Sequence, residues 1–108
     1  MKVTLIAQAS VLIETSDCKI LTDPWFFGTA FNDSWKLFPE AAWNDELYKD
    51  IDFLWVSHEH PDHFHVPTLK SMPQEFKDRV TLLFQKNNSD KMPNAFRKML
   101  GFKNIILL

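Results

Sequence analysis

Three histidines and one aspartate lie within six residues near the middle of the chain, in the order His58, His60, Asp62 and His63. In extended backbone, alternate side chains project to the same face, so His58 and His60 can converge on one ion. Asp62 continues this alternation, His63 lies beside it, and Pro61 stiffens the turn between the two pairs. The spacing predicts a site for two adjacent divalent cations, with these four residues as metal ligands.

A cation bound at these residues would lower the pKa of a coordinated water toward neutrality. A water that bridges two cations supplies a nucleophile without any serine or cysteine. The predicted chemistry is therefore hydrolysis, in which a metal-bound hydroxide attacks an ester, an amide or a phosphodiester. We count Asp62 as a catalytic residue as well as a ligand. The simpler hypothesis, a surface turn without ligands, is disfavoured because all four histidines of the chain fall within eight residues.

Two ionisable residues beside the motif are left out of the ligand set. His65 lies outside the H-x-H-x-D-H pattern and just before Pro67, so we interpret it as a solvated or helix-capping side chain. Glu59 should point away from His58 and His60, which favours an exposed or supporting role over that of a general base.

Secondary-structure patterns indicate how these residues are positioned. Apolar and β-branched runs predict strands over 3–8, 11–15, 18–22, 51–57, 80–84 and 104–108. Capping and spacing signals predict helices over 44–49, 67–72 and 89–100, with Gly101 after the last. The first three strands form a meander, and the fourth leads directly into the histidines. Strands that come first and then alternate with helices predict a sheet with helices on one face.

The segment from Trp25 to Trp43 is aromatic but has neither helical nor strand periodicity, so we expect a structured loop. Its aromatic side chains either line a substrate entrance or belong to a core or interface, and we favour the second role. These side chains are Trp25, Phe26, Phe27, Phe31 and Trp35.

Composition narrows the class of protein. With 108 residues and 45% hydrophobic content, the chain is long enough for one globular domain, 1–108, with a packed core. The net charge is −2 and the sequence has no run of basic residues, so it does not indicate binding to nucleic acid or to an anionic membrane. Cys18 is the only cysteine, which excludes an intrachain disulfide and fits a reducing cytoplasm. We expect a cytoplasmic protein with a small-molecule substrate.

The motif resembles the signature H-x-H-x-D-H of the metallo-β-lactamase superfamily, with the preceding strand in place. Upstream, Asp23-Pro24-Trp25 followed by Gly28-Thr29-Ala30-Phe31 resembles the metallo-β-lactamase-like domain of CMP-N-acetylneuraminate hydroxylases and their bacterial relatives. The resemblance covers roughly residues 3–108. It implies an α/β (α+β) fold, the αββα sandwich of that superfamily, with a mainly antiparallel or mixed sheet. It also implies zinc as the metal, with iron or manganese as alternatives and up to two ions in a complete domain.

Asp23 resembles the superfamily's aspartate at the end of an early strand, which lies beneath the metal ligands and orients them. A plain strand-ending Asp-Pro turn is an equally good interpretation of the local sequence.

The resemblance also implies what is absent. A complete superfamily domain has two halves, and the second contributes further His and Asp ligands, whereas this chain has no histidine after His65. We therefore expect a truncated domain, the N-terminal half, in which a single ion binds weakly and hydrolysis is poor or absent. The parent protein is expected to be an enzyme. A sheet without its second half should drive homo-oligomerisation or association with the missing C-terminal half.

Three alternatives remain open. Within the superfamily, the chain could be phosphodiesterase-like or lactonase-like, as in relatives of ascorbate-6-phosphate lactonase or of N-acylphosphatidylethanolamine-hydrolysing phospholipase D. It could instead be a non-catalytic fragment that binds a metal for structure or serves as an interaction module. A nucleic-acid-processing role is disfavoured because the chain has a net negative charge and no run of basic residues to bind phosphates. Hydroxylation by a Rieske centre is not expected, because such a centre needs two cysteines.

Overall fold

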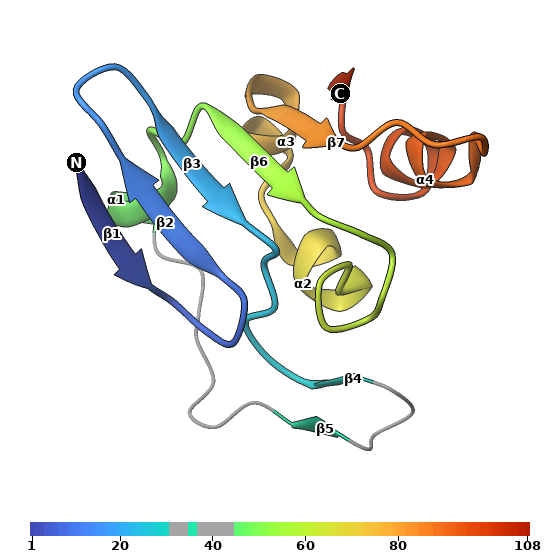
Figure 1. Ribbon diagram of the computed structural model, residues 1–108, viewed down its shortest axis with the longest axis horizontal. Coiled ribbons are helices and arrows are strands. Elements are labelled where there is room, and N and C mark those ends of the chain that lie inside the picture. Colours follow the sequence, from blue (N-terminus) through green and yellow to red (C-terminus); the bar gives the residue numbers. More distant parts are fainter. Residues whose placement is uncertain (31–34, 37–44) are drawn as a thin grey trace.

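A six-stranded mixed sheet forms the centre of the computed structural model, which describes residues 1–30, 35–36 and 45–108 (Figure 1). The strand order is β1-β2-β3-β6-β7-β8. These strands are β1 (Lys2–Leu5), β2 (Val11–Glu14), β3 (Lys19–Thr22), β6 (Phe53–Val56), β7 (Thr81–Phe84) and β8 (Asn104–Leu107). A separate two-stranded sheet pairs β4 (Thr29–Ala30) with β5 (Trp35–Lys36).

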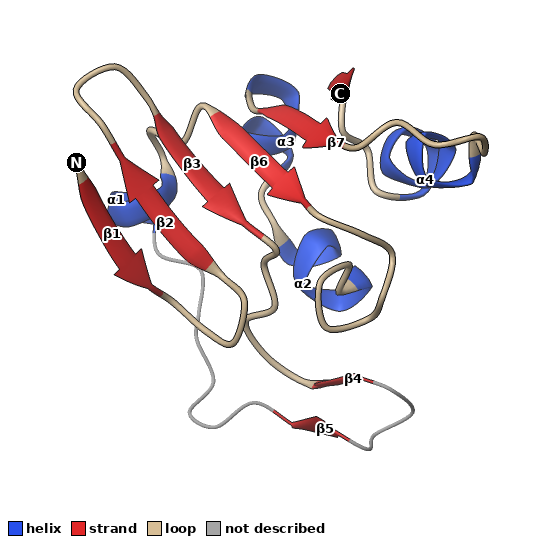
Figure 2. Cartoon of the chain, viewed as in Figure 1, coloured by secondary structure: helices blue, strands red, loops and turns tan. Residues whose placement is uncertain are grey.

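Short helices connect the later strands (Figure 2). They are α1 (Asp45–Tyr48), α2 (Val66–Ser71), α3 (Gln74–Arg79), α4 (Lys91–Asn94) and a π-helical turn (Ala95–Met99) that continues α4. Pro67 lies in the first turn of α2, where its missing N–H costs no helical hydrogen bond. Gly101 follows the π-helical turn with φ of 82°, the left-handed conformation that commonly ends helices.

The connections determine which strand pairs are parallel. β1, β2 and β3 pair antiparallel, which confirms the predicted meander. β3–β6, β6–β7 and β7–β8 pair in parallel, because each connection is long enough to cross over. Parallel neighbours end at the same edge of the sheet, so the residues after β3, β6 and β7 come together.

The hydrophobic core lies on one face of the sheet. The register aligns Leu12, Leu21, Leu54 and Leu82 across four strands, and all four are fully buried. Helical side chains pack against this row, including Leu69, Phe76 and Phe96. In Figure 1, α1 and α3 are drawn behind the strands. This confirms the prediction of a mixed sheet with helices on one face.

The opposite face of the sheet is apolar but only partly covered. It carries the residues that alternate with the buried row, and these are half-buried: Ile13, Ile20, Phe53, Trp55 and Leu83. Among the residues that the structure describes, no helix lies over this face. A half-buried apolar face of this kind is a candidate for association with another protein surface.

Several local predictions were incomplete. No sequence pattern predicted α3, because Phe76 is its only buried apolar residue. The predicted helix 89–100 is shorter and changes to π-helical geometry at Ala95. The segment 25–43, expected to lack strands, contains β4 and β5. The cap predicted at Asn44 lies outside the described residues.

The aromatic segment divides between core and surface. Trp25 and Phe26 are each 1% exposed, as expected for core residues, and Phe27 packs against the main core. Trp35 is 50% exposed, so a core role is wrong for this side chain. Phe31 lies outside the described residues.

In the described part of the chain, no helix is both long and apolar enough to cross a membrane.

We propose that a second copy of the chain covers the apolar sheet face in solution, because burial of this face removes apolar area from water. Light scattering should therefore give a mass above that of the monomer. Leu83→Lys should shift the protein toward the monomer, since it places a charge on this face, whereas Ser89→Lys makes the same charge change on an exposed loop and should not. A monomeric wild-type protein would contradict the proposal.

Candidate metal centre

The site is built where β3 and β6 end side by side. Leu21 pairs with Leu54 and Thr22 with Trp55, so Asp23 and Ser57 follow their strands at the same edge. The Asp23 N–H donates to the Trp55 carbonyl at 2.7 Å, and the Ser57 N–H donates to Asp23 Oδ1 at 2.6 Å. Asp23 therefore ties the start of the histidine loop to the end of β3.

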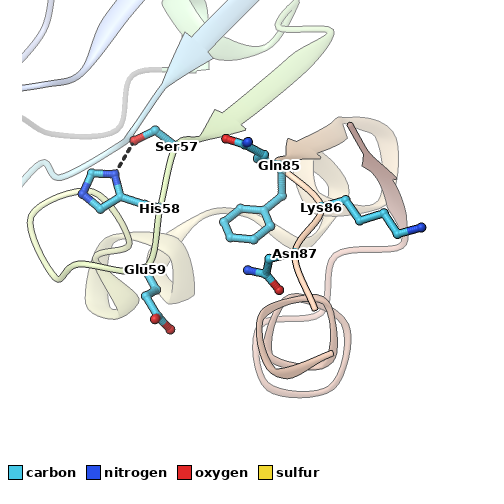
Figure 3. Close-up of a pocket in the computed structure, with 7 residues that line it drawn as sticks. Ser57, His58, Glu59, Gln85, Lys86 and Asn87 are labelled. Atoms are coloured by element: carbon cyan, nitrogen blue, oxygen red, sulfur yellow. Dashed lines mark hydrogen bonds between the residues drawn. The ribbon is translucent and has the colours of Figure 1, made fainter. Parts of the chain in front are cut away.

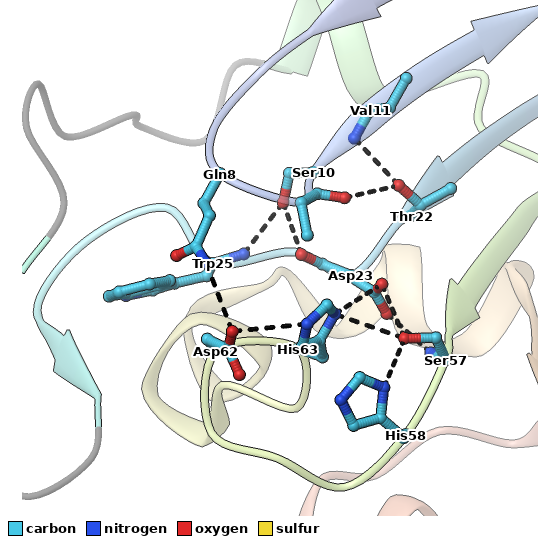
Figure 4. A network of polar contacts seen from close by, with 11 residues as sticks. Gln8, Ser10, Val11, Thr22, Asp23, Trp25, Ser57, His58, Asp62 and His63 are labelled. Carbon is cyan, nitrogen blue, oxygen red and sulfur yellow. Dashed lines mark hydrogen bonds and ion pairs between the residues drawn. The ribbon is translucent and has the colours of Figure 1, made fainter. Parts of the chain in front are cut away.

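A strained turn holds the Asp23 carboxylate in place. Asp23 has φ of 36°, in the left-handed region that a non-glycine residue seldom adopts. The Ser10 hydroxyl donates to the Asp23 carbonyl at 2.6 Å and accepts from the Trp25 N–H at 3.1 Å. Asp23 itself is only 6% exposed. These bonds compensate for the strain and keep the carboxylate buried at the strand ends (Figure 4).

The two oxygens of Asp23 orient two imidazole rings. His63 Nδ1 lies 2.9 Å from Asp23 Oδ2, and a carboxylate only accepts, so Nδ1 carries the proton. The Ser57 hydroxyl lies 2.8 Å from the same oxygen and must donate to it, since two acceptors at this distance would repel. Its oxygen can then only accept from His58 Nδ1, at 2.9 Å. In its neutral form, a ring that carries its proton on Nδ1 presents the lone pair of Nε2, the atom that can bind a metal.

The histidine motif itself forms a compact turn. The N–H groups of His63 and Phe64 both donate to the His60 carbonyl, at 2.9 and 2.7 Å. The ring of His58 lies 4.1 Å from that of His63 and 4.6 Å from that of His60, measured between centroids. His58 and His63 are half-buried, whereas His60 is exposed. The structure therefore brings the three predicted imidazole ligands together.

Asp62 completes the donor set and is 7% exposed. Its Oδ2 accepts from the Gln8 side-chain amide at 3.3 Å and lies 3.4 Å from His63 Nε2. Its Oδ1 is buried without a hydrogen-bond partner among the described residues. A buried carboxylate oxygen without a partner is costly unless a cation or water meets it. The donor set and this oxygen both fit a divalent cation.

The side chains are not gathered tightly enough to enclose an ion. Within residues 1–30, 35–36 and 45–108, no three His, Cys, Asp or Glu side chains are arranged to hold one. The assignment of His58, His60, Asp62 and His63 as ligands therefore stays a prediction, as does the orienting role of Asp23 toward a metal.

His65 has a structural role. It is 2% exposed, so the alternative of a solvated side chain was wrong, but its Nδ1 caps α2 by accepting from the Thr68 N–H at 3.3 Å. Its Nε2 donates to the Thr29 carbonyl at 2.9 Å. Burial lowers the pKa of His65, and the bond to Thr29 opposes this only in part. With both ring nitrogens occupied, His65 fits a cap and not a ligand. Glu59 is exposed, as expected.

Three polar residues of the site were missed from the sequence: Gln8, Ser10 and Ser57. Gln8 contacts Asp62 across 54 positions, and Ser10 and Ser57 contact Asp23 across 13 and 34 positions. Local residue spacing does not reveal such contacts. Only Ser57 had a local signal, since it directly precedes the first histidine.

The fold and the histidine turn together define a β-lactamase-like domain with a candidate metal centre. The sequence profile of the β-lactamase superfamily domain matches residues 2–103, and the chain belongs to this family. The resemblance noted from the motifs is confirmed.

Relatives and solved structures extend the comparison. The chain is 38% identical to the cytidine monophosphate-N-acetylneuraminic acid hydroxylase of Asterias rubens over 80 residues, which cover 72% of the chain and 12% of that protein. The chain thus spans a small part of this relative.

Two solved structures have a similar fold. The isothiocyanate hydrolase from Delia radicum gut bacteria matches 100% of the chain and 41% of its own, with a TM-score of 0.67 and 28% identity. CmlA, a diiron β-hydroxylase from Streptomyces venezuelae, matches 98% of the chain and 20% of its own, with a TM-score of 0.61 and 23% identity. The second match shows the fold alone.

Removal of the Asp23 carboxylate should destabilise the protein, because Asp23→Ala leaves the half-buried Ser57 N–H and its neighbours without this acceptor. We expect a loss of about 2–4 kcal/mol in the free energy of unfolding, measured by urea denaturation. Asp17→Ala removes an exposed aspartate from a turn and should change stability by less than about 0.5 kcal/mol. Equal effects of the two substitutions would contradict the assigned role of Asp23.

Proposed function

We propose that this chain is the metal-binding module of a metal-dependent hydrolase, with His58, His60, Asp62 and His63 as ligands of one or two divalent cations. The observation that carries the proposal is made at Asp62, whose Oδ2 lies 3.4 Å from His63 Nε2 and whose Oδ1 is buried without a hydrogen-bond partner among the described residues. The contacts that direct the Nδ1 protons of His63 and His58 toward Asp23 and Ser57 support it further, because the neutral rings then present Nε2 to a metal.

A bound cation would act as a Lewis acid and lower the pKa of a coordinated water toward neutrality. The residues of the chain prepare the ligands for it. Asp23 accepts the Nδ1 proton of His63, and the Ser57 hydroxyl oxygen accepts that of His58. Gln8 holds one oxygen of Asp62 and leaves the other free for the cation. We propose zinc as the metal, with iron and manganese as alternatives, because imidazole and carboxylate suit all three.

The substrate class is an ester, an amide or a phosphodiester. The likeness to an isothiocyanate hydrolase at 28% identity supports hydrolysis. Hydroxylation, the activity in the name of the Asterias rubens relative, is not proposed for this chain. A Rieske centre needs two cysteines, and Cys18 is the only one. The cytoplasmic location expected from the sequence remains a prediction.

A second candidate is a metal-binding or interaction fragment without catalysis. It is favoured by the absence of three donors arranged around one point in the described part of the chain. Metal binding that persists without hydrolysis of any ester, amide or phosphodiester would support this candidate over the first.

Metal analysis tests whether the histidine turn binds a cation. The chain, incubated with zinc and separated from free metal, should retain zinc by elemental analysis, and the double variant His58→Ala/His60→Ala should lose it, since two ligands are removed. Glu59→Gln changes the exposed residue between the two histidines and should retain the metal.

Two results would contradict the proposal. One is equal metal content in the wild type and the double variant, which would place the metal elsewhere. The other is a wild-type chain that is folded by circular dichroism but binds no metal.

A further inference from the structure

A second polar feature lies beside the candidate metal centre, in a pocket of about 230 Å³. Its walls come from two loops at the same edge of the sheet, Ser57–Glu59 after β6 and 85–87 after β7, together with Phe84 (Figure 3). The parallel pairing of Val56 with Phe84 brings these loops side by side. Ligands of open α/β sheets bind outside the carboxyl ends of strands, and His58 belongs to both the pocket and the metal motif.

The pocket presents amide hydrogen-bond donors in a fixed orientation. Asn87 Oδ1 accepts from the Ser89 N–H at 2.9 Å, so its Nδ2 amide group is left to donate. In Figure 3 the Asn87 nitrogen points toward the side of the pocket that carries Glu59. The amide of Gln85 has no hydrogen-bond partner among the described residues. Both side chains are exposed and available to a ligand.

The charged side chains in the lining of the pocket are one carboxylate, Glu59, and one ammonium group, Lys86. Glu59 contributes a carboxylate to the wall, and its nearest cation in the described part of the chain is Lys91, at 4.0 Å. The Lys86 side chain points away from the pocket in Figure 3. A phosphodiester would meet the carboxylate without a directed cation, whereas a neutral carbonyl would meet the Asn87 amide.

We propose that this pocket is the substrate subsite of the candidate metal centre, and that it binds an uncharged, carbonyl-bearing group through the Asn87 amide donor and Gln85. A volume of about 230 Å³ suits one acyl-amide or similar small group. The proposal rests on the proposed function and narrows its substrate to esters and amides with a neutral polar group beside the scissile bond.

A ligand titration followed by ¹H–¹⁵N NMR tests the subsite without requiring activity or metal. The probes are N-acetylglycinamide, which is neutral, and dimethyl phosphate, which is an anion. N-acetylglycinamide should shift the side-chain amide signals of Asn87 and Gln85, with a dissociation constant in about the millimolar range for so small a ligand. The Asn88 side chain does not line the pocket and is the internal control. Dimethyl phosphate should bind at least about 10-fold more weakly.

A matched pair of variants tests the donor itself. Asn87→Asp keeps the oxygen that accepts from Ser89 but removes the amide donor, and it should weaken N-acetylglycinamide binding by about 5- to 10-fold. Asn88→Asp makes the same charge change one residue further along and should leave binding unchanged.

The proposal is overturned if dimethyl phosphate binds as tightly as the neutral probe. It is also overturned if neither probe moves the Asn87 signal, or if the two variants behave alike. Because the titration needs no cation, loss of metal binding would refute the proposed function and leave this result intact. If the chain binds metal but neither probe shifts the Asn87 signal, the subsite proposal is refuted and the proposed function is not.

Discussion

The parallel pairing of β3 with β6 is the constraint on which the site depends. It places Asp23 opposite the start of the histidine loop, and the carboxylate then accepts from the Ser57 backbone, the Ser57 hydroxyl and His63. Because a carboxylate only accepts, these contacts fix the proton on Nδ1 of both His58 and His63. One buried side chain thus connects the strand order of the sheet to the protonation of the candidate ligands.

The rest of the loop follows from this anchor. The His60 carbonyl closes the turn, Asp62 is buried beneath it, and His65 caps α2, so the motif leads directly from strand to helix. Asp62 lies beside His63, and its Oδ1 has no hydrogen-bond partner among the described residues. A fold that buries such an oxygen bears a cost that a bound cation would relieve. The same edge of the sheet continues into the pocket after β7, so the candidate ligands and the candidate subsite share His58.

The sequence predicted the features that depend on local pattern. β-branched runs located the strands, Pro67 and Gly101 marked helix ends, and the histidine spacing identified the motif. Features that depend on distant contacts were not predictable. α3 has one buried apolar residue and therefore no periodic signal. Gln8 meets Asp62 across 54 positions, and the buried His65 ring lies near Trp25 and donates to the Thr29 carbonyl 36 positions away. The two interpretations of Asp23 are equal on local sequence, because its partners Ser57 and His63 lie 34 and 40 positions away.

X-ray absorption spectroscopy of the zinc-loaded chain reports which atoms surround the metal, and it therefore tests whether the histidine turn is the metal site. We expect scattering from more than one imidazole ring, with nitrogen and oxygen neighbours at about 2.0–2.2 Å. We also expect the imidazole contribution to fall in His58→Ala/His60→Ala. A zinc ion surrounded by oxygen alone, without imidazole scattering, would contradict the claim that the histidine turn is a metal site.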